Sequence, residues 1–173
     1  MIVRRLHVEA QDSVFTPCIK VAFATCDRRH INQHFGQAQS FMIYGVDKTT
    51  YQLIDVIDFS AGHSGGEKLS RDRALFGHQT LTDRIATLTD CDAVYFNECG
   101  SSALKQLLVL KTYPIKVKEG EGIKWCLDSL VFELNSPSGG WIDKALTRTD
   151  DKPNEDRTAY LDSLLNEPWD SKE

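Results

Sequence analysis

Thiol and imidazole side chains gather in one short segment of the chain, residues 26–36. Cys26, His30 and His34 offer one thiolate and two imidazoles within nine residues, and these ligand types suit zinc, copper and iron–sulfur centres. Their spacing matches no structural zinc motif, so packing roles for these residues are the alternative. His34 is the strongest candidate ligand of the three. Phe35 and Gly36 after it provide an apolar anchor and a point of backbone freedom for an exposed imidazole.

A second candidate segment covers residues 97–102. Cys99, Gly100 and Ser101 stand where a helix is expected to begin, and the N–H groups and positive end of a helix attract anions and lower the pKa of a nearby thiol. A glycine turn beside a buried cysteine is the alternative. Lysines outnumber acids in the stretch that follows, which indicates either a site for an anionic ligand or a solvated surface; the residues are Lys105, Lys111, Lys116, Lys118 and Lys124 against Glu119 and Glu121.

Motifs of the common enzyme classes are missing from the chain. We find no phosphate-binding glycine loop, nucleophile elbow, His-Glu-x-x-His pair or dinucleotide fingerprint. A metal-dependent hydrolase would need clustered carboxylates near a central strand, and the apolar run 19–25 contains none. Nothing in these motifs calls for an enzyme, and no enzymatic activity is expected.

Hydrophobic patterning predicts the elements that position these segments. Apolar runs indicate strands over 19–25, 40–46, 51–59, 93–96 and 114–117, with a hairpin joining the second and third. Apolar residues at helical spacing indicate helices through 81–88, 103–108, 123–134 and 141–148, and a long loop is expected over 60–79. Cys91 and Cys126 fall within or beside the apolar runs and are expected in the core.

The order of these elements predicts an α/β fold. We expect a mixed five-stranded sheet with an antiparallel meander at one side and helices on its faces. In open α/β sheets, ligands bind beyond the carboxyl ends of the parallel strands. The segments 26–36 and 97–102 follow two strands that should be neighbours, so we expect the two segments to meet.

We divide the 173-residue chain into an N-terminal extension (1–17), an α/β domain (18–148) and an acidic C-terminal tail (149–173), and charge marks the last boundary. Residues 150–173 contain eight acids and three bases, whereas the rest is neutral. Since phosphate binding needs a basic face, a nucleic acid is not an expected partner. The tail is either solvated, with one short helix around Tyr160, or a docking segment for a partner protein.

Cysteine usage and apolar runs bear on the compartment. Five scattered cysteines without a Cys-x-x-Cys pair favour a reducing, cytoplasmic environment. The first residues lack the pattern of a signal peptide, and no apolar run approaches the roughly 20 residues that span a bilayer. No membrane partner is expected.

Several sequence blocks together resemble one known family. They are, in order, residues 20–25, His34-Phe-Gly with its continuation to Tyr44, residues 90–94, Cys99-Gly-Ser-Ser-Ala103 and residues 114–120. These blocks are similar to those of the NifX family, which with NafY and the carboxyl-terminal part of NifB comprises nitrogenase iron–molybdenum cofactor-binding proteins. The resemblance covers about residues 18–148. Lys111-Thr-Tyr113 departs from it, since a glycine is common there.

The resemblance implies a fold, a cargo and partners. The fold would be a ribonuclease-H-like three-layer fold without that fold's nuclease carboxylates. The function would be to carry iron–sulfur precursors of the iron–molybdenum cofactor, bound transiently, from NifB to the NifE–NifN scaffold. His34 is the cluster ligand that the resemblance implies, whereas Cys26, His30 and Cys99 are candidates from their loops. A ribonuclease-H-like hydrolase and a regulatory interaction protein of the nitrogen-fixation system are the alternatives.

Overall fold

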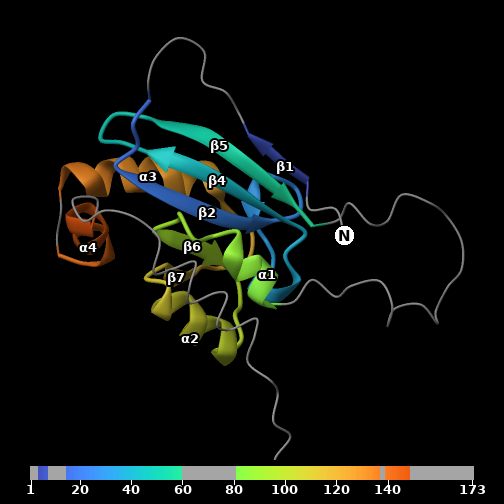
Figure 1. Cartoon of the computed structure of the whole chain (residues 1–173). Coiled ribbons are helices and arrows are strands. Elements are labelled where there is room, and N and C mark those ends of the chain that lie inside the picture. Colours follow the sequence, from blue (N-terminus) through green and yellow to red (C-terminus); the bar gives the residue numbers. More distant parts are fainter. Residues whose placement is uncertain (1–3, 8–14, 60–80, 137–138, 149–173) are drawn as a thin grey trace, which may run out of the picture.

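The computed structural model describes residues 4–7, 15–59, 81–136 and 139–148. Its sheet is organised by β2 (Ile19–Thr25), whose residues are buried except for the half-buried Lys20. Strand β2 pairs antiparallel with β4 (Ser40–Val46), which continues through a hairpin into β5 (Tyr51–Asp58). On its other side β2 pairs in parallel with β6 (Ala93–Phe96), followed by β7 (Tyr113–Lys116). The expected mixed sheet with an antiparallel meander is confirmed (Figure 1).

The main sheet has six strands, so the expected count of five is wrong. Strand β1 (Arg4–His7), from the segment that the sequence sets apart as an extension, pairs antiparallel with β5. Arg5 Nη2 lies 2.7 Å and His7 Nδ1 lies 3.0 Å from the carboxylate of Asp55, which is 3% exposed. Burial raises the pKa of Asp55, but the hydrogen bonds from Arg5 and His7 outweigh it and lower the pKa. The contacts of Arg5 and His7 with Asp55, more than apolar packing, therefore hold β1 at the edge of the sheet.

Helices cover both faces of the sheet (Figure 1). Alternate residues of β2 point to opposite faces. Val21 and Phe23 pack in one core cluster with α3 (Ile123–Asn135) and α4 (Trp141–Arg148). Ala22 and Ala24 belong to a second cluster with α1 (Leu81–Ala86) and α2 (Ser101–Val109). The result is three layers with a core on each side of the sheet.

Most of the expected elements are confirmed within one or two residues. Strand β7 lies one residue earlier than predicted, and α4 covers the predicted 141–148. Cys91 and Cys126 are 1% and 4% exposed, which confirms their place in the core. The predicted loop 60–79 and the predicted tail helix around Tyr160 lie outside the described residues. Within the described ranges, each helix is too short or too polar to cross a membrane.

A small second sheet holds two loops together. Strand β3 (His30–Ile31) pairs antiparallel with β8 (Glu121–Gly122). A short 3-10 helix, η1 (Phe35–Gln37), follows β3. Because β3 lies in the loop after β2 and β8 follows β7, the second sheet brings these two loops to the same end of the main sheet.

Candidate functional site

Three loops meet at the carboxyl ends of the parallel strands β2, β6 and β7. The first two are the candidate segments 26–36 and 97–102, so their expected proximity is confirmed; the third is 117–120. Backbone hydrogen bonds join the three: Phe35 N to Glu98 O (2.8 Å), Asn97 N to Gln33 O (3.1 Å) and Gly120 N to Ile31 O (3.1 Å). The sheet thus fixes the loops relative to one another.

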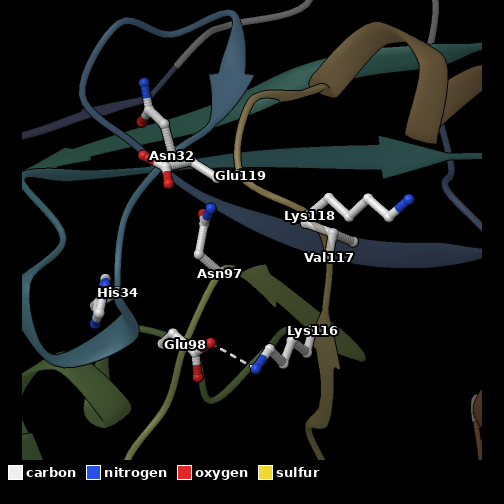
Figure 2. A pocket seen from close by; sticks show the side chains of 8 residues that line it. All are labelled: Asn32, His34, Asn97, Glu98, Lys116, Val117, Lys118 and Glu119. Atoms are coloured by element: carbon white, nitrogen blue, oxygen red, sulfur yellow. Dashed lines mark hydrogen bonds and ion pairs between the residues drawn. The ribbon is translucent and has the colours of Figure 1, made fainter.

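The loops enclose an open cavity with a volume of about 650 Å³. Its lining is polar and mixed in charge, with two lysines, two glutamates, two asparagines and a histidine (Figure 2). The lining residues are Asn32, His34, Asn97, Glu98, Lys116, Val117, Lys118 and Glu119. A cavity of this size and composition can take a polar, small-molecule-sized ligand.

His34 presents its imidazole at one side of this cavity. It is exposed and is the N-cap residue of η1, with φ −69° and ψ 139°. The next residue, Phe35, is fully buried, and its ring centroid lies 5.5 Å from that of Phe41 and 6.0 Å from that of Phe96. Phe35 is therefore the apolar anchor that the sequence predicts, and it holds the backbone beneath His34.

Gly36 is the expected point of backbone freedom beside His34. Its φ does not lie in the left-handed region, and a Cβ built there would meet no atom within 4 Å. A side chain at this position would therefore meet no steric barrier. The expected role of Gly36 beside His34 stays a prediction.

Asn97 is a cavity residue that the sequence analysis did not single out. It follows β6 directly, is 7% exposed, and its Oδ1 is buried without a hydrogen-bond partner in the described part of the chain. Figure 2 shows its side chain extending from the β6 loop toward the middle of the lining residues. Buried polar groups normally have partners, so this oxygen is an acceptor that a ligand or water in the cavity can use.

Four charged residues line the cavity together with His34. Lys116 Nζ lies 2.5 Å from Glu98 Oε1, and this hydrogen bond lowers the pKa of Glu98. Lys118 and Glu119 are exposed and form no ion pair with another described residue. Gly120 closes their turn at φ +81°, a left-handed conformation that favours glycine. Lys118 is therefore a cation that a ligand can engage.

Cys26 and His30 lie in a turn outside the cavity lining. The turn is held by Asp27, whose Oδ1 accepts hydrogen bonds of 2.8 Å from the backbone N–H groups of Arg29 and His30. His30 Nδ1 lies 2.7 Å from Asp27 Oδ2, and this contact together with the backbone bonds lowers the pKa of Asp27. Cys26 is exposed, and its backbone N–H donates to Asn32 Oδ1 at 3.0 Å. His30 thus has a structural role in the turn.

Cys99, Gly100 and Ser101 also lie outside the cavity lining. Gly100 is the N-cap of α2 and Ser101 is its exposed first residue. The expectation of a lowered thiol pKa at Cys99 is wrong, because burial of the half-buried side chain raises its pKa to about 11. Without a bound metal, Cys99 is therefore protonated at neutral pH.

The four candidate metal ligands are not gathered into one centre. Among the described residues, no three histidine, cysteine, aspartate or glutamate side chains converge to hold a metal ion. Of Cys26, His30, His34 and Cys99, the cavity lining includes His34 alone. The arrangement offers one imidazole, a buried amide and lysine ammonium groups, which suits a ligand held by few bonds.

Known proteins are similar to this chain over most of its length. The family model described as "Dinitrogenase iron-molybdenum cofactor" matches residues 17–131. NifX of Azotobacter vinelandii is 38% identical over 152 residues, which are 88% of this chain and 87% of that protein. NifX of Sinorhizobium fredii is 26% identical over 143 residues, 80% of this chain and 86% of that protein. The "FeMo cofactor biosynthesis protein NifB" of Chlorobaculum tepidum is 35% identical over 103 residues, 60% of this chain and 21% of that protein.

Proposed function

The chain belongs to the NifX family of dinitrogenase iron–molybdenum cofactor proteins, and we propose that it acts in the biosynthesis of that cofactor as a carrier of its iron–sulfur precursors. The observation that carries this proposal is the cavity in which His34, from the family's His-Phe-Gly block, stands with the unpartnered amide of Asn97. The precursor cluster is cargo, held transiently and passed on.

Each polar side chain of the cavity can make a different interaction with such a cargo. The imidazole of His34 supplies a nitrogen ligand to iron. The amide of Asn97 has both donor and acceptor groups for the cluster and its ligands. Lys118, and Lys116 when it leaves Glu98, attract an anionic cluster. One protein ligand and several weak contacts permit release to an acceptor, whereas a closed four-thiolate site would not.

A carrier role requires no catalytic group, and we propose that the protein is not an enzyme. The ribonuclease-H-like label belongs to the same proposal and is supported by the strand order of the main sheet. A hydrolase on that fold would need converging carboxylates, and within the described ranges no such group of three is present. The cytoplasm is the proposed compartment, supported by five cysteines that are all free thiols.

The proposed partners are the proteins on either side of the transfer. NifB would supply the precursor and the NifE–NifN scaffold would accept it. Similarity to a protein named as a cofactor biosynthesis NifB supports the first partner in general terms. The cavity is open at the surface, which suits transfer through a protein–protein contact.

The experiment is an anaerobic transfer assay with the full chain. Purified protein is mixed with isolated precursor cluster, passed over a gel-filtration column, and analysed for iron and sulfide. We expect iron and sulfide to elute with the protein and to move to NifE–NifN when that scaffold is added. Elution of the metal apart from the protein, or its retention after the scaffold is added, would contradict the carrier function.

A further inference from the structure

A second cavity, of about 230 Å³, lies at the opposite end of the parallel strands. We call it the α4 groove; its lining includes Asp92 and Thr112, which directly precede β6 and β7, and Trp141, Lys144 and Arg148 of α4. It shares no lining residue with the His34 cavity. The groove is therefore a separate site, at the amino ends of the strands.

The α4 groove has an excess of positive charge. Lys111, Lys144 and Arg148 line it against the single carboxylate of Asp92. That carboxylate forms an ion pair with Arg148 and accepts a 2.8 Å hydrogen bond from the Lys20 backbone. Lys144 Nζ donates to the Tyr113 hydroxyl at 3.3 Å. Two lysine charges are left without a carboxylate among the described residues.

Lys111 occupies its place at a conformational cost. It follows α2 with φ 58°, where glycine is the favoured residue because a Cβ is strained in left-handed backbone. The Thr112 N–H donates to Leu107 O at 2.9 Å, which completes the helix end and enforces this conformation. This helix end places Lys111 in the lining of the groove.

Apolar surface adjoins the charge. The rings of Tyr113 and Trp141 lie 6.0 Å apart in a tilted arrangement. Leu108 and Val109 of α2 are 55% and 54% exposed, and Leu108 lines the groove. The groove therefore suits a peptide that combines carboxylates with apolar side chains.

The chain itself contains such a peptide. Residues 150–173 have eight acids against three bases and also include Leu161, Leu164, Leu165 and Trp169. The segment begins two residues after Arg148, which lines the groove, and an extended chain covers about 3.3–3.6 Å per residue. We propose that the acidic segment 150–173 binds in the α4 groove of its own chain, with carboxylates on Lys111 and Lys144 and apolar side chains against Trp141 and Leu108.

The test is hydrogen exchange of the full chain, measured by mass spectrometry at low and high salt. We expect the amides of residues 150–173 to exchange at least about tenfold more slowly than in an unstructured peptide at low salt, and to lose this protection at high salt. The double variant Lys111→Glu/Lys144→Glu should lose the protection at low salt. Lys48→Glu/Lys105→Glu changes the charge equally at exposed positions outside the groove and should keep it.

Three results would overturn the proposal. The first is exchange of the segment at the unstructured rate in the unaltered chain. The second is unchanged protection in Lys111→Glu/Lys144→Glu, whose fold is checked by its melting curve; the salt dependence of the unaltered chain decides the question if this variant unfolds. The third is protection that rises with protein concentration, which would assign the groove to the tail of a second copy.

Discussion

The Oδ1 atom of Asn97 is one of three buried side-chain atoms without a hydrogen-bond partner among the described residues, and of these three it alone lines the His34 cavity. Leaving a buried acceptor unsatisfied costs about 1–3 kcal/mol of folding free energy. A protein tolerates such a cost where a ligand removes it on binding. A binding role and a structural role for Asn97 therefore predict different effects of its substitution on stability and on affinity.

We expect Asn97→Leu to leave the free energy of unfolding unchanged or to raise it by about 1 kcal/mol, because the substitution removes the unpaired acceptor and keeps the volume. Affinity for the precursor cluster should fall by about tenfold, the loss of roughly one hydrogen bond to a charged ligand. Urea unfolding and anaerobic cluster titration measure the two quantities. Loss of stability together with unchanged affinity would assign Asn97 to the fold instead.

The thiol of Cys99 gives a prediction that depends on pH. Because burial raises its pKa to about 11, the reactive thiolate is a minor species at pH 8 and grows about tenfold per pH unit. Alkylation of Cys99 by iodoacetamide, followed by peptide mass spectrometry, should therefore accelerate steadily from pH 8 to pH 10. A rate that is already constant above pH 8 would show an activated thiolate and return Cys99 to the list of cluster ligands.

At the residue scale, the sequence predicts the positions of His34 and Phe35 but not the roles of their neighbours. The buried Phe35 follows from an apolar residue in a polar loop. Asn97 could have been found from its place directly after a buried strand, but residue type alone favoured Cys99. Burial leaves the Asn97 oxygen without a partner and raises the pKa of Cys99. Because burial is a property of the fold, residue type alone does not reveal these effects.

At the scale of elements, long apolar runs were predictable and short polar strands were not. Strand β1 has the sequence Arg-Arg-Leu-His, and its place at the sheet edge depends on the carboxylate of Asp55, 48 to 50 residues away. Strands β3 and β8 have two residues each, too few for any periodicity. These short elements nevertheless set the site, since the pairing of β3 with β8 joins two of its three loops.

The strained backbone of Lys111, at the end of α2, can be tested by substitution. Lys111 is left-handed at the helix end, with φ 58°. Lys111→Gly should stabilise the protein by about 1 kcal/mol, since the left-handed penalty of a residue with a Cβ is about 1–2 kcal/mol and glycine loses some of this gain through its freer unfolded chain. Urea unfolding at high salt, which screens the lost charge, measures the effect; destabilisation would contradict the assigned strain.

At the scale of the whole molecule, both faces of the sheet carry a buried cluster that needs no bound metal. We expect the protein made without cluster-synthesis proteins to unfold in one cooperative transition, with circular dichroism and fluorescence giving the same midpoint in urea. Precursor cluster at 100 times its dissociation constant should add about 2.7 kcal/mol to the free energy of unfolding. A cluster-free protein without a cooperative transition would mean that the cargo is part of the core.

His34 is the residue that we propose holds the cargo, and a matched pair of histidines tests this role. His34 lines the cavity, whereas His30 lies four residues earlier in the same loop, exposed and bound to Asp27. The measurement is anaerobic titration of the unaltered protein, His34→Ala and His30→Ala with isolated precursor cluster. We predict that His34→Ala loses most of the affinity and retains weak, salt-sensitive binding, while His30→Ala binds as the unaltered protein does. Equal affinity of His34→Ala and the unaltered protein would contradict the account.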